Sequence, residues 1–156
     1  MSFVVTGLPV EDFRPLFGLS DADLTARGIV RHTATAAIGF PCRITLEDAQ
    51  AGDTLLLLNY EHQPAETPYR SRHAIFVNES ATQTRRAANE IPGCLAVRPH
   101  IALRAYDEAG MMTAAEISPG ADLAPVIERM LANPQVAYLH AHNAGRGCFA
   151  ARIDRA

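Results

Sequence analysis

One amphipathic segment, residues 122–132, constrains the fold more than any other part of the chain. Its apolar side chains recur at i, i+3, i+4, i+7 and i+8, the spacing of a helix with one buried face. They are Leu123, Val126, Ile127, Met130 and Leu131. Asp122 is a candidate N-cap, and Asn133-Pro134 ends the segment. A helix of this kind buries its apolar face against a second layer, and the rest of the chain reads mainly as strands.

Short alternating or apolar runs bounded by turn residues predict these strands. They cover residues 3–7, 29–35, 53–61 and 73–77, a hairpin over 100–117 with its turn near 107–110, and a closing hairpin of 136–142 and 148–153. Ser20 is expected to cap a short helix over 21–28, and Pro15 interrupts a poor helical segment over 10–20. The pattern predicts a single α+β domain over residues 1–156. It should have a mainly antiparallel sheet and two or three helices on one side.

Composition excludes several classes of function. All 14 basic residues are arginine, so no lysine can form a Schiff base or serve as a P-loop cation. A net charge of −3 without a basic run speaks against a nucleic-acid partner. The N-terminus does not resemble a signal peptide, and no apolar run is long enough for a membrane span. We therefore expect a cytoplasmic protein with free thiols at Cys42, Cys94 and Cys148. Homo-oligomers are compatible with the sequence, which does not fix the oligomeric state.

The closing hairpin gathers candidate site residues on one face. Strand side chains alternate, so His140 and His142 share a face opposite the apolar side chains of the first arm. Matching the apolar faces allows a three-residue loop over 143–145 or a five-residue loop over 143–147. Cys148 shares the histidine face in either register, whereas Phe149 is expected on the apolar face.

Three interpretations of this face stay open. Cys148 is a nucleophile with His142 or His140 as its base. Alternatively, the two histidines bind a metal, with a third ligand from Cys148, Glu61, His62 or His73. In the third interpretation the histidines are solvated strand residues and the cysteine only fills space. No four-ligand set is evident, so we expect no tightly bound structural zinc and assign no metal ligand; the sequence names no cofactor.

Two other segments carry candidate ligand-binding residues. Arg43 follows Cys42 at the entry to a strand, and Tyr69-Arg70 lies in a proline-containing loop between two strands. A guanidinium group can hold a carboxylate or phosphate through two parallel hydrogen bonds, with the tyrosine ring as a wall. Arg104, in the central hairpin, is expected on a solvated face. None of the fingerprints of nucleotide binding, zinc proteases or serine hydrolases is found.

Several segments in order resemble a bacterial family known as domain of unknown function twelve hundred and three. They are "GFPCRITLEDA", "LLLNYEHQP", "PYRSRHAIFV", "RAYDEAGMM" and "YLHAHNAGRGCFAARIDR". The resemblance covers nearly the whole chain and implies one intact domain of bacterial origin. It implies no activity and no catalytic residue.

These observations favour a small-molecule site for an anionic ligand, in a binding domain or an enzyme. In that hypothesis Cys148 is the reactive thiol and His142 its base. The ligand-binding residues are Arg43, Tyr69, Arg70, His140 and Asn143. The alternative is a non-catalytic interaction or structural module in which the same residues hold the loops together.

Overall fold

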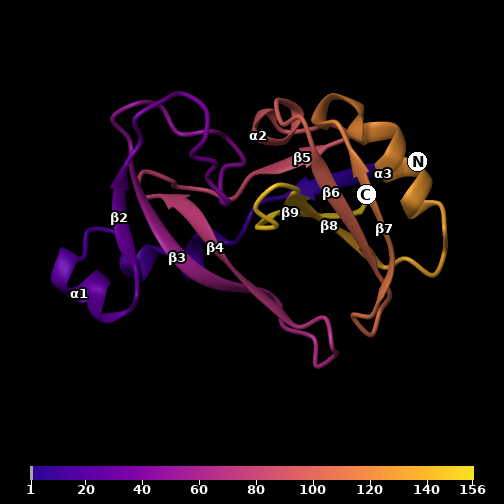
Figure 1. Ribbon diagram of the computed structural model, residues 1–156, viewed down its shortest axis with the longest axis horizontal. Helices are drawn as coiled ribbons and strands as arrows, with labels where there is room; N and C mark the ends of the chain where they lie inside the picture. Colours follow the sequence, from indigo (N-terminus) through magenta and orange to yellow (C-terminus); the bar gives the residue numbers. More distant parts are fainter. Residues whose placement is uncertain (1) are drawn as a thin grey trace.

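The computed structural model describes residues 2–156 and folds them into two antiparallel sheets that lie side by side (Figure 1). The larger sheet has the order β5-β1-β9-β8-β6-β7. Its strands are β1 Phe3–Thr6, β5 Arg86–Ala88, β6 Ile101–Tyr106, β7 Met112–Ser118, β8 Tyr138–Asn143 and β9 Phe149–Arg155. The smaller sheet has the order β2-β3-β4, with β2 Val30–Thr33, β3 Thr54–Gln63 and β4 Ser71–Asn78. The prediction of an α+β domain with antiparallel strands is confirmed, although the strands form two sheets rather than one.

The helices are short. They are α1 Asp21–Ala26, α2 Gly93–Ala96 and α3 Leu123–Leu131, with 3-10 turns η1 Val10–Asp12, η2 Arg14–Leu16 and η3 Gly120–Asp122. The predicted cap of α1 is confirmed, because Ser20 accepts a hydrogen bond from the backbone N–H of Asp23 at 3.1 Å. Asp122 occupies the N-cap position of α3 but makes no side-chain cap bond. The segment before α1 forms two 3-10 turns around Pro15. No helix in residues 2–156 is long and apolar enough to cross a membrane.

Helix α3 covers one face of the larger sheet. Leu123, Ile127 and Leu131 are fully buried and belong to one hydrophobic cluster with the inward side chains of the central strands. Those side chains include Val5, Leu103, Leu139, Ala141 and Ile153. Because strand side chains alternate, the residues between them point to the opposite face of the sheet. That face carries His140 and His142.

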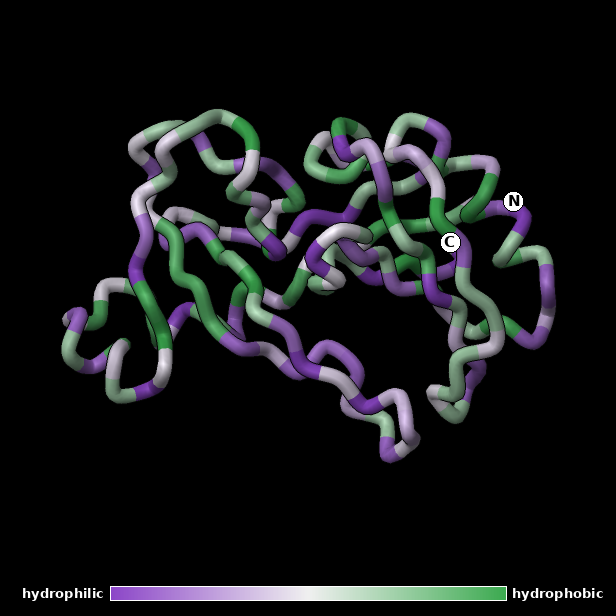
Figure 2. Tube along the Cα trace, viewed as in Figure 1, coloured by the Kyte–Doolittle hydropathy of each residue, from purple (hydrophilic) through white to green (hydrophobic). Residues whose placement is uncertain are grey.

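The hairpin of β3 and β4 connects the two sheets. Its first half is apolar and pairs with β2, whereas its far half is polar and reaches toward the turn between β6 and β7 (Figures 1 and 2). Two hydrogen bonds hold the far half in place. Gln63 donates to the Tyr138 hydroxyl at 2.8 Å, and Thr67 donates to the Gly110 carbonyl at 3.1 Å. The far half of β3 therefore lies close to the histidine face of the larger sheet.

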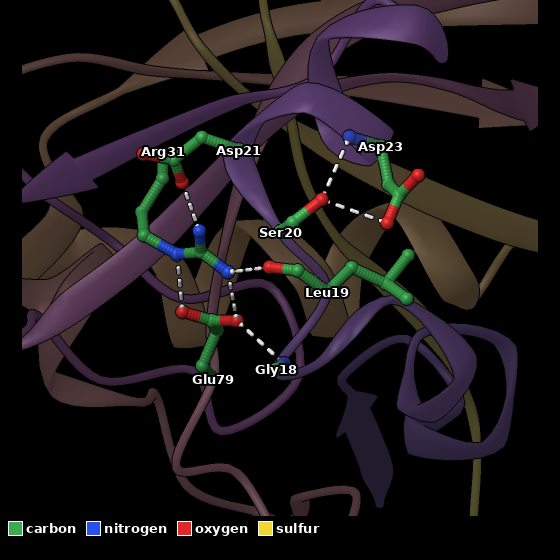
Figure 3. Close-up of polar contacts among 7 residues, drawn as sticks. All are labelled: Gly18, Leu19, Ser20, Asp21, Asp23, Arg31 and Glu79. Carbon is green, nitrogen blue, oxygen red and sulfur yellow. Dashed lines mark hydrogen bonds and ion pairs between the residues drawn. The ribbon is translucent and has the colours of Figure 1, made fainter.

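A partly exposed ion-pair network fixes the outer side of the smaller sheet (Figure 3). Arg31 of β2 donates two hydrogen bonds to Glu79 at 3.0 and 3.1 Å, a third to the Leu19 carbonyl and a fourth to Asp21. Glu79 also accepts the backbone N–H of Gly18 at 3.0 Å. One arginine thus ties α1 and the segment before it to the end of β4.

The closing hairpin adopts a register that the sequence did not predict. His140 pairs with Arg152 and Ala141 with Ala151, but the ladder then shifts and His142 pairs with Phe149. A β-bulge inserts one residue into one strand and reverses the faces beyond it. Five residues, 144–148, separate the two strands, but neither predicted partner of His142, Arg146 or Cys148, is found opposite it. The prediction that Phe149 lies on the apolar face is wrong, because the bulge turns this ring to the histidine face.

Candidate functional site

Three buried histidines converge on the face of the larger sheet opposite α3. His140 and His142 come from β8, and His62 comes from β3 of the hairpin that crosses this face. One ring nitrogen from each lies within 4.8 Å of one nitrogen of the other two. The side chains are 2%, 0% and 7% exposed, respectively. A cluster so well buried differs from the solvated strand residues of the third interpretation.

His62 lies at a β-bulge. In the ladder between β3 and β4, Glu61 pairs with Arg72 and Gln63 pairs with Ser71, so His62 is the extra residue. Bulges redirect a side chain and are frequent beside functional sites. His62 follows Tyr60 by two residues, and Tyr60 pairs with His73, so alternation places His62 on the same face of the hairpin as His73.

The turn of the closing hairpin orients His142. Its Nδ1 lies 2.9 Å from the Gly147 carbonyl, which can only accept, so Nδ1 carries the proton. Gly147 has a φ of 75°, a conformation that glycine adopts without strain, and its N–H donates to the Asn143 carbonyl at 2.7 Å. In the neutral ring the lone pair is therefore on Nε2. Among residues 2–156 that buried nitrogen has no hydrogen-bond partner.

A fourth histidine supports the cluster from β4. His73 Nδ1 lies 2.7 Å from His62 Nε2, and the two rings are stacked with centroids 4.7 Å apart. The other nitrogen of His62, Nδ1, is buried and has no partner in the described chain; the same holds for His140 Nδ1. Each of the three converging rings thus has one nitrogen with unused hydrogen-bonding capacity.

Aromatic rings close the cluster on its other sides. Phe149 stacks on His62 with centroids 4.8 Å apart and an angle of 11°, and its edge meets His140 and His142. Tyr106 packs against His140 with centroids 5.0 Å apart. These rings exclude water from the imidazoles without offering them a hydrogen bond.

Burial keeps the histidines neutral. It lowers the pKa of His140 to about 2, that of His142 to about 3 and that of His62 to about 4, with further lowering by neighbouring positive charge. The pKa of His73 is also lowered, first by burial and then by Arg104 and Arg43. Neutral imidazoles are the form that binds a metal ion or accepts a hydrogen bond.

Arg104 lies on the histidine face and is half-buried, contrary to the expectation of a solvated strand face. It pairs with His140 in the ladder between β6 and β8, whereas Arg152 pairs with His140 on the β9 side. Arginines thus flank His140 on both neighbouring strands. Arg152 is ion-paired with Asp154 at 2.8 Å, but Arg104 has no carboxylate partner in the described residues.

Cys148 lies next to the cluster but is held by other groups. Its sulfur accepts hydrogen bonds from Arg43 Nη2 at 3.3 Å and from Asn143 Nδ2 at 3.4 Å. Within residues 2–156 no hydrogen bond joins this sulfur to His140 or His142. The structure therefore brings together three of the predicted residues, Arg43, Asn143 and Cys148, and places the two histidines in the neighbouring cluster.

Besides its hydrogen bond to the Cys148 sulfur, Arg43 links two segments of the backbone. It is 3% exposed and donates to the carbonyls of Phe149 and Pro41 at 2.7 Å each. These bonds fasten the segment before β3 to the start of β9. Desolvation lowers the pKa of this guanidinium group.

Tyr69 and Arg70 lie apart from the sulfur, at the far end of the β3–β4 hairpin. Arg70 is exposed and donates to Glu61 at 2.7 and 3.4 Å, so its guanidinium is already paired with a carboxylate. Tyr69 is half-buried, and its backbone N–H and carbonyl take part in turn bonds with Thr67 and Ser71. None of these bonds reaches Cys148 or Arg43.

A cavity of about 400 Å³ opens beside the cluster. His62, His140 and Phe149 form part of its wall, together with residues of β1, β3 and β9. Its charged wall residues are Arg86, Arg152, Glu61 and Asp154. Arg86 belongs to β5, a strand of three residues that is too short to show a periodicity in the sequence. Nothing in the sequence pattern pointed to this arginine.

A comparison with models of protein families identifies the family to which the chain belongs. The model of the family described as "Protein of unknown function (DUF1203)" matches residues 39–155, a range that includes the histidine cluster, Arg43 and Cys148. Searches of curated proteins and of solved structures found no match. Because the family model matches well over half of the sequence, the chain belongs to the DUF1203 family.

Proposed function

We propose that the domain binds a small anionic molecule in the cavity beside the histidine cluster. The charge balance of the cavity wall carries this proposal. Both acidic residues on the wall are already ion-paired, Glu61 with Arg70 and Asp154 with Arg152. Arg86 has no acidic partner among residues 2–156, so the charge that remains to be neutralised on the wall is positive.

The polar groups of this wall suit a carboxylate or phosphate. The guanidinium of Arg86 can donate two parallel hydrogen bonds to either group. Arg104, on the same sheet face as His140, adds positive potential without a carboxylate partner in the described chain. A cavity with a few convergent polar groups and strongly shifted pKa values is the usual form of a ligand site.

Titration with inorganic phosphate and with a small dicarboxylate tests this proposal. Metal-free protein should bind at least one of them with saturation by calorimetry, and Arg86→Gln should weaken binding at least about tenfold, the effect of losing a charged hydrogen bond. Arg85→Gln is the matched control, because that neighbouring arginine does not line this cavity and is paired with Glu90. Absence of binding at millimolar concentrations, or an equal loss in both variants, would refute the proposal.

A second candidate is thiol chemistry at Cys148, the catalytic role expected from the sequence. The specific support is the pair of donors on its sulfur, Arg43 and Asn143, since both stabilise negative charge there. A structural module without a reactive site remains the alternative outcome. Alkylation kinetics distinguish the two and are set out in the Discussion.

A further inference from the structure

We propose that His62, His140 and His142 form a binding site for one divalent transition-metal ion, with a fourth coordination position facing the cavity. This metal site is a separate proposal from the anion site, because its evidence is the arrangement of the histidine ring nitrogens and not the arginines of the cavity wall. His62 and His140 both line the cavity, so an ion held by the three rings would lie beside it.

The spacing of the rings fits three imidazoles around one ion. Tetrahedral coordination at metal–nitrogen distances of about 2.0–2.1 Å places ring centroids about 5 Å apart. The observed centroid separations are 5.1 Å for His62 and His142 and 5.4 Å for His62 and His140. His140 and His142 are wider apart at 6.2 Å, so this pair would close slightly around an ion.

The hydrogen bond behind His142 selects a metal-binding tautomer, and the contact behind His62 allows one. His142 gives its Nδ1 proton to the Gly147 carbonyl, which leaves the lone pair of Nε2 directed away from the turn. His62 Nε2 contacts His73 Nδ1, and a proton donated in that direction leaves the lone pair of His62 on Nδ1. Histidines that bind metals commonly donate their other ring N–H to a carbonyl or a similar acceptor in this way.

The energetic cost of burying ring nitrogens without hydrogen-bond partners also favours a metal site. A buried polar atom without a partner is costly, and three occur here on three adjoining rings: His62 Nδ1, His140 Nδ1 and His142 Nε2. With a lone pair on each of these nitrogens, one water molecule, which has two protons, cannot donate to all three at once. A single cation satisfies all three.

The ligand set indicates the class of ion. Imidazole suits Zn²⁺, Fe²⁺, Co²⁺, Ni²⁺ and Cu²⁺, whereas Mg²⁺ and Ca²⁺ prefer oxygen. Three protein ligands with one open position are typical of catalytic rather than structural zinc. Such a site is distinct from the four-ligand structural zinc that the sequence argued against. The open position and nearby arginines would favour an anion or hydroxide as the fourth ligand.

Cobalt(II) titration of chelator-treated protein tests the inference without any anionic ligand. The native chain should bind one equivalent and develop the visible absorption of tetrahedral cobalt, and zinc should displace it. His140→Leu and His142→Ala should each weaken cobalt binding at least about a hundredfold, since each removes one of three ligands. His100→Ala and His32→Ala are matched controls, because these two histidines lie outside the cluster, and both should bind as the native chain does.

A second measurement guards against variants that fail to fold. The melting temperature of the native chain should rise with added zinc, whereas that of folded His140→Leu should not. No cobalt absorption and no thermal shift in the native chain would overturn the inference. Equal loss of binding in His100→Ala and His142→Ala would do the same. Neither result bears on phosphate or dicarboxylate binding by the metal-free protein, so the two proposals fail separately.

Discussion

His73 and His62 share a short contact across the ladder of the long hairpin, with 2.7 Å between His73 Nδ1 and His62 Nε2. This contact fixes the orientation of a ring that projects from a β-bulge, and no other hydrogen bond in the described residues holds the His62 ring. His73→Phe should preserve the stack but remove the acceptor. We expect cobalt affinity to fall about 10–100-fold while all three proposed ligands remain. An affinity equal to that of the native chain would show that His73 does not orient His62.

Removing a cluster histidine should stabilise the metal-free protein. His140 is 2% exposed and has a buried nitrogen without a partner in the described chain, so His140→Leu replaces a costly polar group by an apolar one of similar size. We expect an increase of about 1 kcal/mol in the free energy of unfolding by urea, as when a functional residue is traded for stability. A loss of stability of that size would instead indicate a structural role for the imidazole.

Cys148 should alkylate faster than Cys94 at neutral pH. Cys94 is an internal reference, because burial raises the pKa of its thiol to about 12. Asn143→Ala removes one of the two donors to the Cys148 sulfur and should slow its reaction about fivefold, as expected for a hydrogen bond of about 1 kcal/mol. His142→Ala should have the smaller effect, since no hydrogen bond joins this ring to the sulfur. Mass-resolved iodoacetamide kinetics measure each site. If Cys148 reacts no faster than Cys94, thiol chemistry at this position is excluded.

The ion pair of Arg31 and Glu79 should make stability depend on pH. The hydrogen bonds from Arg31 lower the pKa of the Glu79 carboxyl below its ordinary value of 4.5. Its stabilising contribution is therefore fully present above the unfolded-state pKa, and it is lost as the pH falls through the lower folded-state pKa. Glu79→Gln should reduce the urea midpoint clearly near neutral pH and much less at about pH 3. Glu90→Gln, which removes an exposed pair with Arg85, is the control and should change little at either pH. A loss in Glu79→Gln that does not change with pH would contradict the prediction.

The packing of α3 predicts a large effect from its first buried residue. Leu123 is fully buried against the larger sheet, so Leu123→Ala should lower the free energy of unfolding by about 2–5 kcal/mol. Asp122→Ala, one residue earlier, removes an exposed side chain that makes no cap bond and should cost less than about 1 kcal/mol. Similar costs for the two variants would mean that α3 does not depend on its apolar face.

Periodic patterns predicted most of the elements of the fold, but not α2 or β5. The helix spacing of residues 123–131 and the alternation in the strands led to α3 and to the β-strands that were predicted. The arrangement in two sheets was not predicted, because strand pairing depends on long-range contacts that alternation does not encode. Strand β5 was not predicted, because three residues are too few to show an alternating pattern.

Regular alternation alone was not sufficient to predict the site. Alternation placed His140 and His142 on one face, and His62 and His73 were recognised as possible further ligands. The bulge that turns Phe149 toward the cluster leaves no signature in a single sequence. The contact of Arg43 with Cys148 joins residues 105 positions apart, and only the folded chain brings them together.

Anomalous diffraction from crystals grown with zinc tests the account most directly. We predict one strong anomalous peak at the zinc edge, bonded to ring nitrogens of His62, His140 and His142 at about 2.0–2.1 Å, with its fourth position open to the cavity. Fully occupied zinc at surface carboxylates or at His100, with no density between the three rings, would contradict the proposed metal site.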